Sequence, residues 1–112
     1  MKTVSITRNN DFLRLYRRGK SAADPFVVSY ILPNRLGIIR LGLTTSKKIG
    51  NAVARSRARR VMRASFREVM PQIKSGYDIV LVARTRTTFI KSTALTPVLT
   101  AQLESLGALQ SK

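Results

Sequence analysis

The side chains with the clearest chemical potential are the arginines and lysines that crowd one short stretch of the chain. Between residues 47 and 67 there are eight of them and no acid: Lys47, Lys48, Arg55, Arg57, Arg59, Arg60, Arg63 and Arg67. Arg59, Arg63 and Arg67 recur every fourth residue, a spacing that places them on one face of a helix. Like charges at this spacing destabilise a helix by a few tenths of a kcal/mol per pair. A solvated structural face would gain from glutamate partners, so the pattern favours phosphates from a binding partner, which guanidinium groups hold through two hydrogen bonds.

The residues just before this ladder form a second phosphate-binding feature. Gly50 allows close backbone approach, and Asn51 can cap the helix that follows. The free N–H groups and the dipole of a helix N-terminus attract phosphate, and Lys47 and Lys48 lie next to them in the chain. Together with the arginines, these residues predict a helix that binds nucleic acid.

Aromatic side chains form another candidate surface. Phe12 and Tyr16 fall on one face of a predicted helix, and Val28 and Tyr30 fall on one face of a predicted strand. If the helix lies over that face, these side chains flank a groove in which single-stranded bases can stack beside basic groups. A core role stays open for Phe12, whereas the hydroxyls of Tyr16 and Tyr30 suit a partly wet groove.

The composition argues against catalysis by the protein itself. The chain of 112 residues has 21 Lys or Arg, five Asp or Glu, and a formal charge of +16. It lacks His and Cys, and its acids show no paired or metal-ligand spacing, so we assign no catalytic residue and no metal ligand. The charge predicts a polyanionic partner, with nucleic acid ahead of an anionic membrane, because the basic helix lacks a broad apolar face. With no long apolar run and no signal core, we expect a cytoplasmic protein without a membrane partner.

The elements that must position these residues follow from hydrophobic spacing and from helix and turn signals. We expect, in order, a helix over 9–18 stopped by Gly19, strands over 25–32 and 36–45, a helix from Gly50 to Met70 ended by Pro71, a strand over 77–83, and a helix capped by Thr96 that starts at Pro97 and ends at Gly107. The first two strands should pair as a hairpin, since only a few turn residues separate them. The order αββαβα predicts a single α+β domain over 1–112, an α-β sandwich with a β-α-β unit around the arginine-rich helix.

One long segment is similar to a known family signature. The protein subunits of bacterial ribonuclease P carry a motif that this chain resembles over residues 46–60, Ser-Lys-Lys-Ile-Gly-Asn-Ala-Val-Ala-Arg-Ser-Arg-Ala-Arg-Arg, continued by Arg63 and Phe66-Arg67-Glu68. Further similarity in the family's order and spacing covers about residues 8–106, including Asp11-Phe12, Tyr16, Gly19, Tyr30, 40–43 and 77–84. Ser56 stands where the family has Asn between two arginines, so the two donors of that amide are lost.

The resemblance implies a partner and a set of residue roles. In this family a catalytic RNA uses Mg²⁺ to release the 5′ leader of precursor tRNA, so the chain would be an endoribonuclease subunit that is inert alone. Binding of the catalytic RNA would fall to Lys47, Lys48, Asn51, Arg55, Ser56, Arg57, Arg60 and Arg67. Binding of the leader would fall to Phe12, Tyr16, Val28, Tyr30, Arg59 and Arg63. The resemblance also implies a left-handed β-α-β crossover, opposite to the usual hand.

One other function remains open at this point. A ribosomal or RNA-chaperone-type protein would also bind structured RNA, but without a processing role and without dependence on a leader. Under the ribonuclease P assignment, the partners are ribonuclease P RNA and precursor tRNA, Mg²⁺ is bound mainly by RNA, and the protein itself is a monomer.

Overall fold

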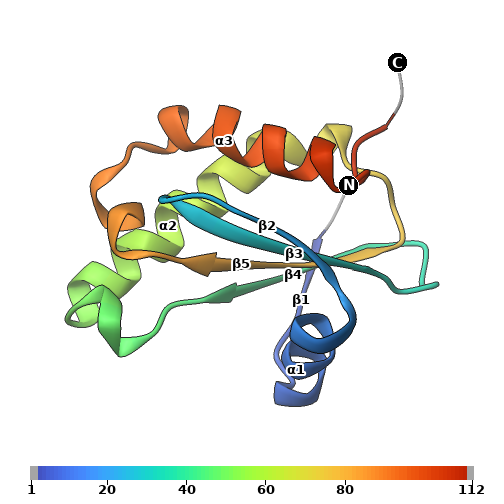
Figure 1. Ribbon diagram of the computed structural model, residues 1–112, viewed down its shortest axis with the longest axis horizontal. Helices are drawn as coiled ribbons and strands as arrows, with labels where there is room; N and C mark the ends of the chain where they lie inside the picture. Colours follow the sequence, from blue (N-terminus) through green and yellow to red (C-terminus); the bar gives the residue numbers. More distant parts are fainter. Residues whose placement is uncertain (1–2, 111–112) are drawn as a thin grey trace.

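A mixed five-stranded sheet with helices on both faces forms the body of the protein in the computed structural model, which describes residues 3–110 (Figure 1). The strands are β1 (Thr3–Ser5), β2 (Lys20–Ala23), β3 (Val27–Pro33), β4 (Ile39–Thr44) and β5 (Tyr77–Ala83), in the spatial order β1-β4-β5-β3-β2. The helices are α1 (Asn9–Arg18), α2 (Ala52–Val69) and α3 (Ser92–Ser105), with short 3₁₀ turns η1 (Lys47–Ile49), η2 (Met70–Gln72) and η3 (Thr85–Phe89). The α+β class and the β-α-β unit, β4-α2-β5, are confirmed, while the outer limits predicted at residues 1 and 112 lie outside the described residues.

The predicted hairpin is wrong, because β5 lies between β3 and β4. It pairs antiparallel with β3 and parallel with β4. The loop over 34–38 must therefore cross the start of β5, where it is hydrogen-bonded to Gly76. Asn34 N–H donates to the Gly76 carbonyl at 2.8 Å, and Gly76 N–H donates to the Ile38 carbonyl at 3.1 Å. The apolar run in β5, buried on both faces, needs a partner on each side, and it displaces the local pairing.

Two short strands at the edges of the sheet were absent from the predicted order. β1 pairs parallel with β4, and β2 pairs antiparallel with β3, so the observed order is βαβββαβα. Neither strand is longer than four residues, and the Lys-Ser-Ala-Ala sequence of β2 has little β propensity. Both strands are held by pairing with a longer neighbour rather than by their own sequence.

The two faces of the sheet carry different layers. α2 and α3 cover one face and enclose the larger core, whose members include Ala58, Met62 and Phe66 of α2 (Figure 1). α1 crosses the other face alone, and Leu15 packs there with Ile6 and Val80. Since α1 is short, part of that second face stays open.

α3 starts earlier than predicted, so Thr96 is not its cap and Pro97 is not its first residue. The helix begins at Ser92, whose carbonyl accepts a hydrogen bond at 2.9 Å from the Ser65 hydroxyl of α2. Leu95, in the added turn, is fully buried. This burial and the bond to α2 hold a first turn that the proline signal placed outside the helix.

Gly19 ends α1 as predicted, but for a different physical reason. Its backbone is extended, with φ −73° and ψ 156°, rather than left-handed. A Cβ on Gly19 would lie 2.5 Å from the Leu15 carbonyl oxygen and 2.8 Å from that of Ile31. The glycine is therefore needed because the chain leaves α1 in direct contact with β3.

We expect Gly19→Ala to destabilise the fold by about 1–3 kcal/mol, because backbone must move to make room for the methyl group. Urea unfolding followed by circular dichroism would measure the change, with Lys20→Ala at the exposed neighbouring position as the control. Equal stability of the two variants would show that the contact with Ile31 is not a constraint.

Candidate nucleic-acid interface

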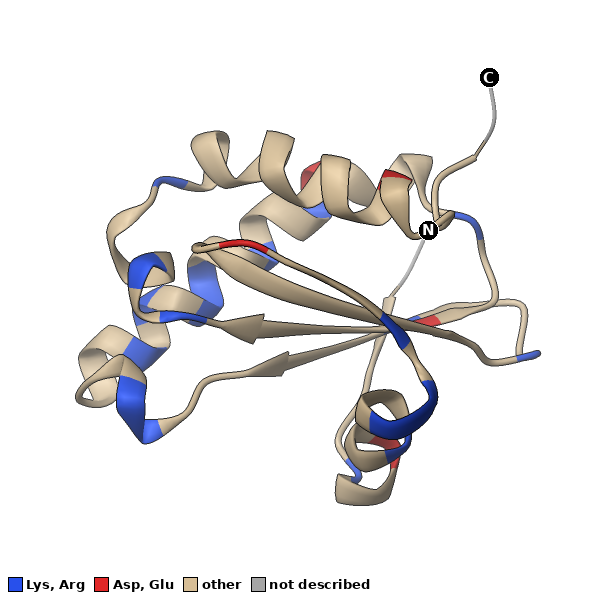
Figure 2. Cartoon of the chain, viewed as in Figure 1, with Lys and Arg blue, Asp and Glu red and all other residues tan. Residues whose placement is uncertain are grey.

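The basic residues of α2 run along the helix, starting at one end of the molecule (Figure 2). Ala58 and Met62 are buried, whereas Arg57, Arg60, Arg63 and Arg67 are exposed. Figure 2 shows that Lys and Arg gather over η1, the first half of α2 and η3, and that no Asp or Glu lies among them in the described residues. Of the ladder predicted from the four-residue spacing, Arg63 and Arg67 are therefore open to solvent, whereas Arg59 is half-buried.

The start of α2 combines a side-chain cap with a tight turn and exposed basic residues. The Asn51 side chain accepts a hydrogen bond from Ala54 N–H at 2.9 Å, as its predicted capping role requires. Gly50 has φ 136°, a conformation that side chains rarely adopt, and Arg55 donates to its carbonyl at 2.8 Å. Lys47 and Lys48 lie exposed in η1 beside this turn.

The exposed arginines of α2 line two separate hollows. One, of about 400 Å³, is lined by Arg63 and Arg67 together with Thr3, Ser5, Leu41, Phe66 and Met70. The other, of about 350 Å³, is lined by Arg57, Arg60, Val61, Ala64 and Ser92. Ser56 is exposed at the helix start, next to Arg57. Arg63, which the family resemblance assigns to the leader, thus lies with Arg67, which it assigns to the catalytic RNA.

The aromatic surface lies on the sheet face that α1 only partly covers. The rings of Tyr16 and Tyr30 pack edge to face, with centroids 5.0 Å apart. Phe12 packs into the small core under α1, where its ring approaches Gly42. Val28, two residues before Tyr30 on the same strand face, is half-buried. The structure thus brings together all four residues on one face, with Phe12 also serving as core.

Two threonines join the aromatic surface to the basic helix. The Tyr16 hydroxyl is 3.0 Å from the Thr44 hydroxyl, and Arg59 donates to the Thr45 hydroxyl at 2.8 Å. Thr44 ends β4 and Thr45 follows it, so two consecutive residues contact a tyrosine of α1 on one side of the sheet and an arginine of α2 on the other. Sequence reasoning missed both residues, because a threonine at a strand end is ordinary until its partners are known.

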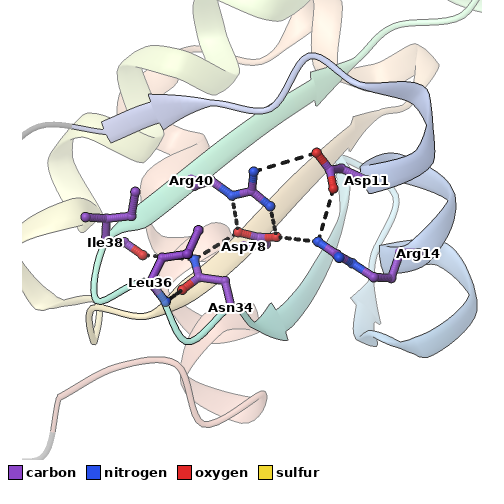
Figure 3. Close-up of polar contacts among 7 residues, drawn as sticks. All are labelled: Asp11, Arg14, Asn34, Leu36, Ile38, Arg40 and Asp78. Atoms are coloured by element: carbon purple, nitrogen blue, oxygen red, sulfur yellow. Dashed lines mark hydrogen bonds and ion pairs between the residues drawn. The ribbon is translucent and has the colours of Figure 1, made fainter.

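A buried carboxylate positions α1 on the sheet (Figure 3). Asp78 on β5 is fully buried, and Arg40 on β4 donates to its two oxygens at 2.7 and 2.6 Å. Asn34 donates to it at 2.9 Å, and Arg14 of α1 lies 3.4 Å away. Arg40 also lies 3.6 Å from Asp11 of α1, so two acids that are far apart in sequence meet at one arginine.

This network determines the ionisation of Asp78. Burial raises the pKa of Asp78. The hydrogen bonds from Arg40 and Asn34 and the charges of Arg40 and Arg14 lower it by a larger amount together, so the pKa lies below its ordinary value. The hydrogen bond to Asp78 also raises the pKa of Arg40 above its ordinary value. The carboxylate is therefore held as an anion in the folded protein. A charged residue inside the apolar pattern of a predicted strand, as Arg40 is, is the sequence signal that could have revealed this network.

The described residues offer no cluster of three or more His, Cys, Asp or Glu side chains that could hold a metal ion. Over the same residues, no helix combines the length and the apolar character that a membrane crossing requires.

Comparisons with known proteins point to one family. The family described as Ribonuclease P matches residues 1–107. The ribonuclease P protein component of Thermoanaerobacter sp. (strain X514) is 47% identical over 83 residues, which cover 74% of this chain and 72% of that protein. The corresponding protein of Clostridioides difficile (strain 630) is 40% identical over 84 residues, which cover 74% of each chain.

Solved structures show the same fold. The RNase P protein of Staphylococcus aureus superposes with a TM-score of 0.83 at 31% identity, covering 97% of this chain and all of that one. The RNase P protein from Thermotoga maritima gives a TM-score of 0.77 at 25% identity, covering 96% and 98% of the two chains.

The Asp78 network generates a prediction on pH. A carboxylate with a lowered pKa stabilises the folded state above its unfolded pKa of about 3.9, and this stabilisation is lost as pH falls through the lower folded value. We expect Asp78→Asn to lower the free energy of unfolding by about 3 kcal/mol at pH 7, because Arg40 loses a buried charge partner. The stability of this variant should also change less than that of the unsubstituted protein as the pH falls below 5. Urea unfolding at pH 7, 5, 4 and 3 would measure both effects.

The matched control for this prediction is Glu104→Gln, which makes the same chemical change at an exposed position. Its stability should follow the unsubstituted protein at every pH. If Asp78→Asn behaves in the same way, the buried carboxylate does not stabilise the fold.

Proposed function

The chain belongs to the family of bacterial ribonuclease P protein components, and from this we infer how its two surfaces divide the work of RNA binding. It is a subunit of the ribonuclease P holoenzyme, the endoribonuclease that matures the 5′ end of tRNA, and its partner is ribonuclease P RNA. We assign the catalytic RNA to the basic face of α2 and η1, and the single-stranded leader of precursor tRNA to the aromatic surface under α1.

The junction at Thr44 and Thr45 is the observation that supports this division most strongly. Consecutive residues at this strand end contact Tyr16 and Arg59, so a strand of RNA that stacks on the tyrosines and passes around this end reaches a guanidinium group of α2. Exposed arginines farther along α2 then extend the phosphate-binding surface away from the aromatic rings. A leader in the first surface and a folded RNA on the second would lie side by side.

The catalytic-RNA surface combines backbone N–H donors at the start of α2 with exposed arginine side chains. The backbone N–H groups at the start of α2 and the adjacent Lys47 and Lys48 form a phosphate site whose cap is already set by Asn51. Arg57 and Arg60 project into solvent around their hollow and can adapt to the RNA backbone. Ser56 retains a hydroxyl at this surface, and the neighbouring arginines supply the charge.

The described residues do not fit a magnesium site on the protein. Asp11 and Asp78, the acids that meet, are engaged by Arg40 and Arg14, and no third acid joins them. We propose that Mg²⁺ is held by the RNA subunit and the substrate. The protein's part is then to bind and orient the RNA, so we expect the protein alone to be inert and monomeric.

For the catalytic-RNA surface, we expect Arg55→Ala and Arg60→Ala each to weaken binding to ribonuclease P RNA. Each lost phosphate contact should lower the slope of log affinity against log salt by about one. Filter binding at several salt concentrations would measure this, with Lys74→Ala, between η2 and β5, as the charge-matched control. Unchanged affinity and slope in both arginine variants would contradict the assignment.

For the leader surface, we expect Tyr16→Ala and Tyr30→Ala to weaken holoenzyme binding to precursor tRNA by about 1–3 kcal/mol, the usual contribution of one stacked base. Binding of mature tRNA, which lacks the leader, should change little. Tyr16→Phe removes only the hydroxyl near Thr44 and should retain most of the affinity, because the ring remains. Equal losses with both RNAs would exclude a leader-specific surface.

A further inference from the structure

Phe89 is an aromatic side chain without an internal role. It is 82% exposed, more than any other large apolar residue among those that the structure describes, and it ends η3 just before α3. The other phenylalanines, Phe12, Phe26 and Phe66, all pack against one of the two cores. Phenylalanine is among the residue types most often fully buried, which sets the exposure of Phe89 apart from the other three.

The turn that carries Phe89 is fixed from within. The Thr87 hydroxyl donates to the Phe26 carbonyl and accepts a hydrogen bond from Arg84 N–H at 2.9 Å. Thr87 and Thr88 are both buried, so the two residues before Phe89 use the inner side of the turn. After it, the Ser92 carbonyl is bound by Ser65 of α2. Anchored on both sides, this segment holds Phe89 outward rather than leaving it free to collapse.

The charged residues nearest to Phe89 in the sequence are all cationic. Arg84, Arg86 and Lys91 flank it within five residues and are exposed, and the sequence contains no acid between Asp78 and Glu104. Three residues farther along, Ser92 lines the hollow that also contains Arg57 and Arg60. η3 contacts both α2 and η1, so Phe89 belongs to the basic end of the molecule shown in Figure 2.

We propose that Phe89 stacks on an unpaired base of ribonuclease P RNA, while Arg57 and Arg60 hold a neighbouring phosphate in the hollow beside Ser92. This inference rests on the proposed function and extends its RNA surface from α2 onto η3. An aromatic ring surrounded by cations is the usual platform for an unstacked base, because the ring binds the base and the cations bind its backbone.

Charge favours RNA over a second copy of this chain as the partner of Phe89. A second copy would bring another +16 charges against the same basic end, and Asp24, on the loop that packs against η3, already accepts hydrogen bonds from the Phe26 and Val27 N–H groups. An RNA loop supplies the opposite charge and a flat apolar surface together.

Substitutions at Phe89 separate stacking from charge. Phe89→Ala should weaken binding to the cognate ribonuclease P RNA by roughly 5- to 150-fold, the equivalent of one lost stack, with an unchanged salt slope. Phe89→Tyr should restore binding, whereas Phe89→Leu, which is apolar but not flat, should restore it only in small part. Leu36→Ala removes another exposed apolar side chain, in the loop between β3 and β4, and should have no effect.

A spectroscopic test locates the contact directly. The chain has no Trp, so Phe89→Trp introduces a single fluorescent reporter, with Leu36→Trp as its control. Saturating ribonuclease P RNA should quench the Trp at 89 and protect it from acrylamide, and should leave the Trp at 36 unchanged.

Three results would overturn the proposal. These are wild-type affinity of Phe89→Ala for the RNA, an unquenched Trp at 89 in the bound state, or a dimer in sedimentation that Phe89→Ala abolishes. If the unsubstituted protein and the Arg60 variant behave as proposed while Phe89→Ala has no effect, only the stacking contact fails. If the unsubstituted protein does not bind the RNA, the proposed function itself fails.

Discussion

The buried carboxylate of Asp78 joins parts of the chain that their charges would otherwise push apart. It lies on the central strand and accepts hydrogen bonds from β4 and from the loop after β3, and it also pairs with α1 through Arg14. The chain has only five acidic residues against 21 basic ones, and two of those five acids, Asp11 and Asp78, pair with the same arginine, Arg40. The position of α1, and with it the Tyr16–Tyr30 pair, depends on this concentration of opposite charge.

The remaining basic residues are left available for RNA by the same arrangement. In the described part of the chain, the ion pairs gather around Asp11 and Asp78, at the end of the sheet away from the start of α2. The arginines of α2 therefore keep their charge uncompensated by protein, which costs stability in the free protein and favours the bound state. Under the proposed function, stability and RNA binding thus draw on separate sets of charged residues.

Local signals predicted those elements that are determined locally. Asn51 and Pro71 bracket α2, Gly19 ends α1, and the apolar run of β5 is found where expected. The pairing of β3 with β5, the edge strands and the start of α3 depend on contacts between distant residues, which spacing alone does not reveal. The same limit applies to the site: the basic helix was visible in the sequence, whereas Thr44, Thr45 and the exposure of Phe89 depend on how the chain folds around them.

The insertion of β5 between β3 and β4 has a consequence for how the chain is made. Before β5 emerges from the ribosome, the native pairs that can form are β4 with β1 and β3 with β2, which leaves two small half-sheets with open inner edges. Neither half can close until the chain has been synthesised to Ala83, about three quarters of its length, so folding is delayed by topology. During that interval the high positive charge of the nascent segment opposes pairing of its open edges with other chains. The charge that serves RNA binding in the finished protein thereby also protects the unfinished one.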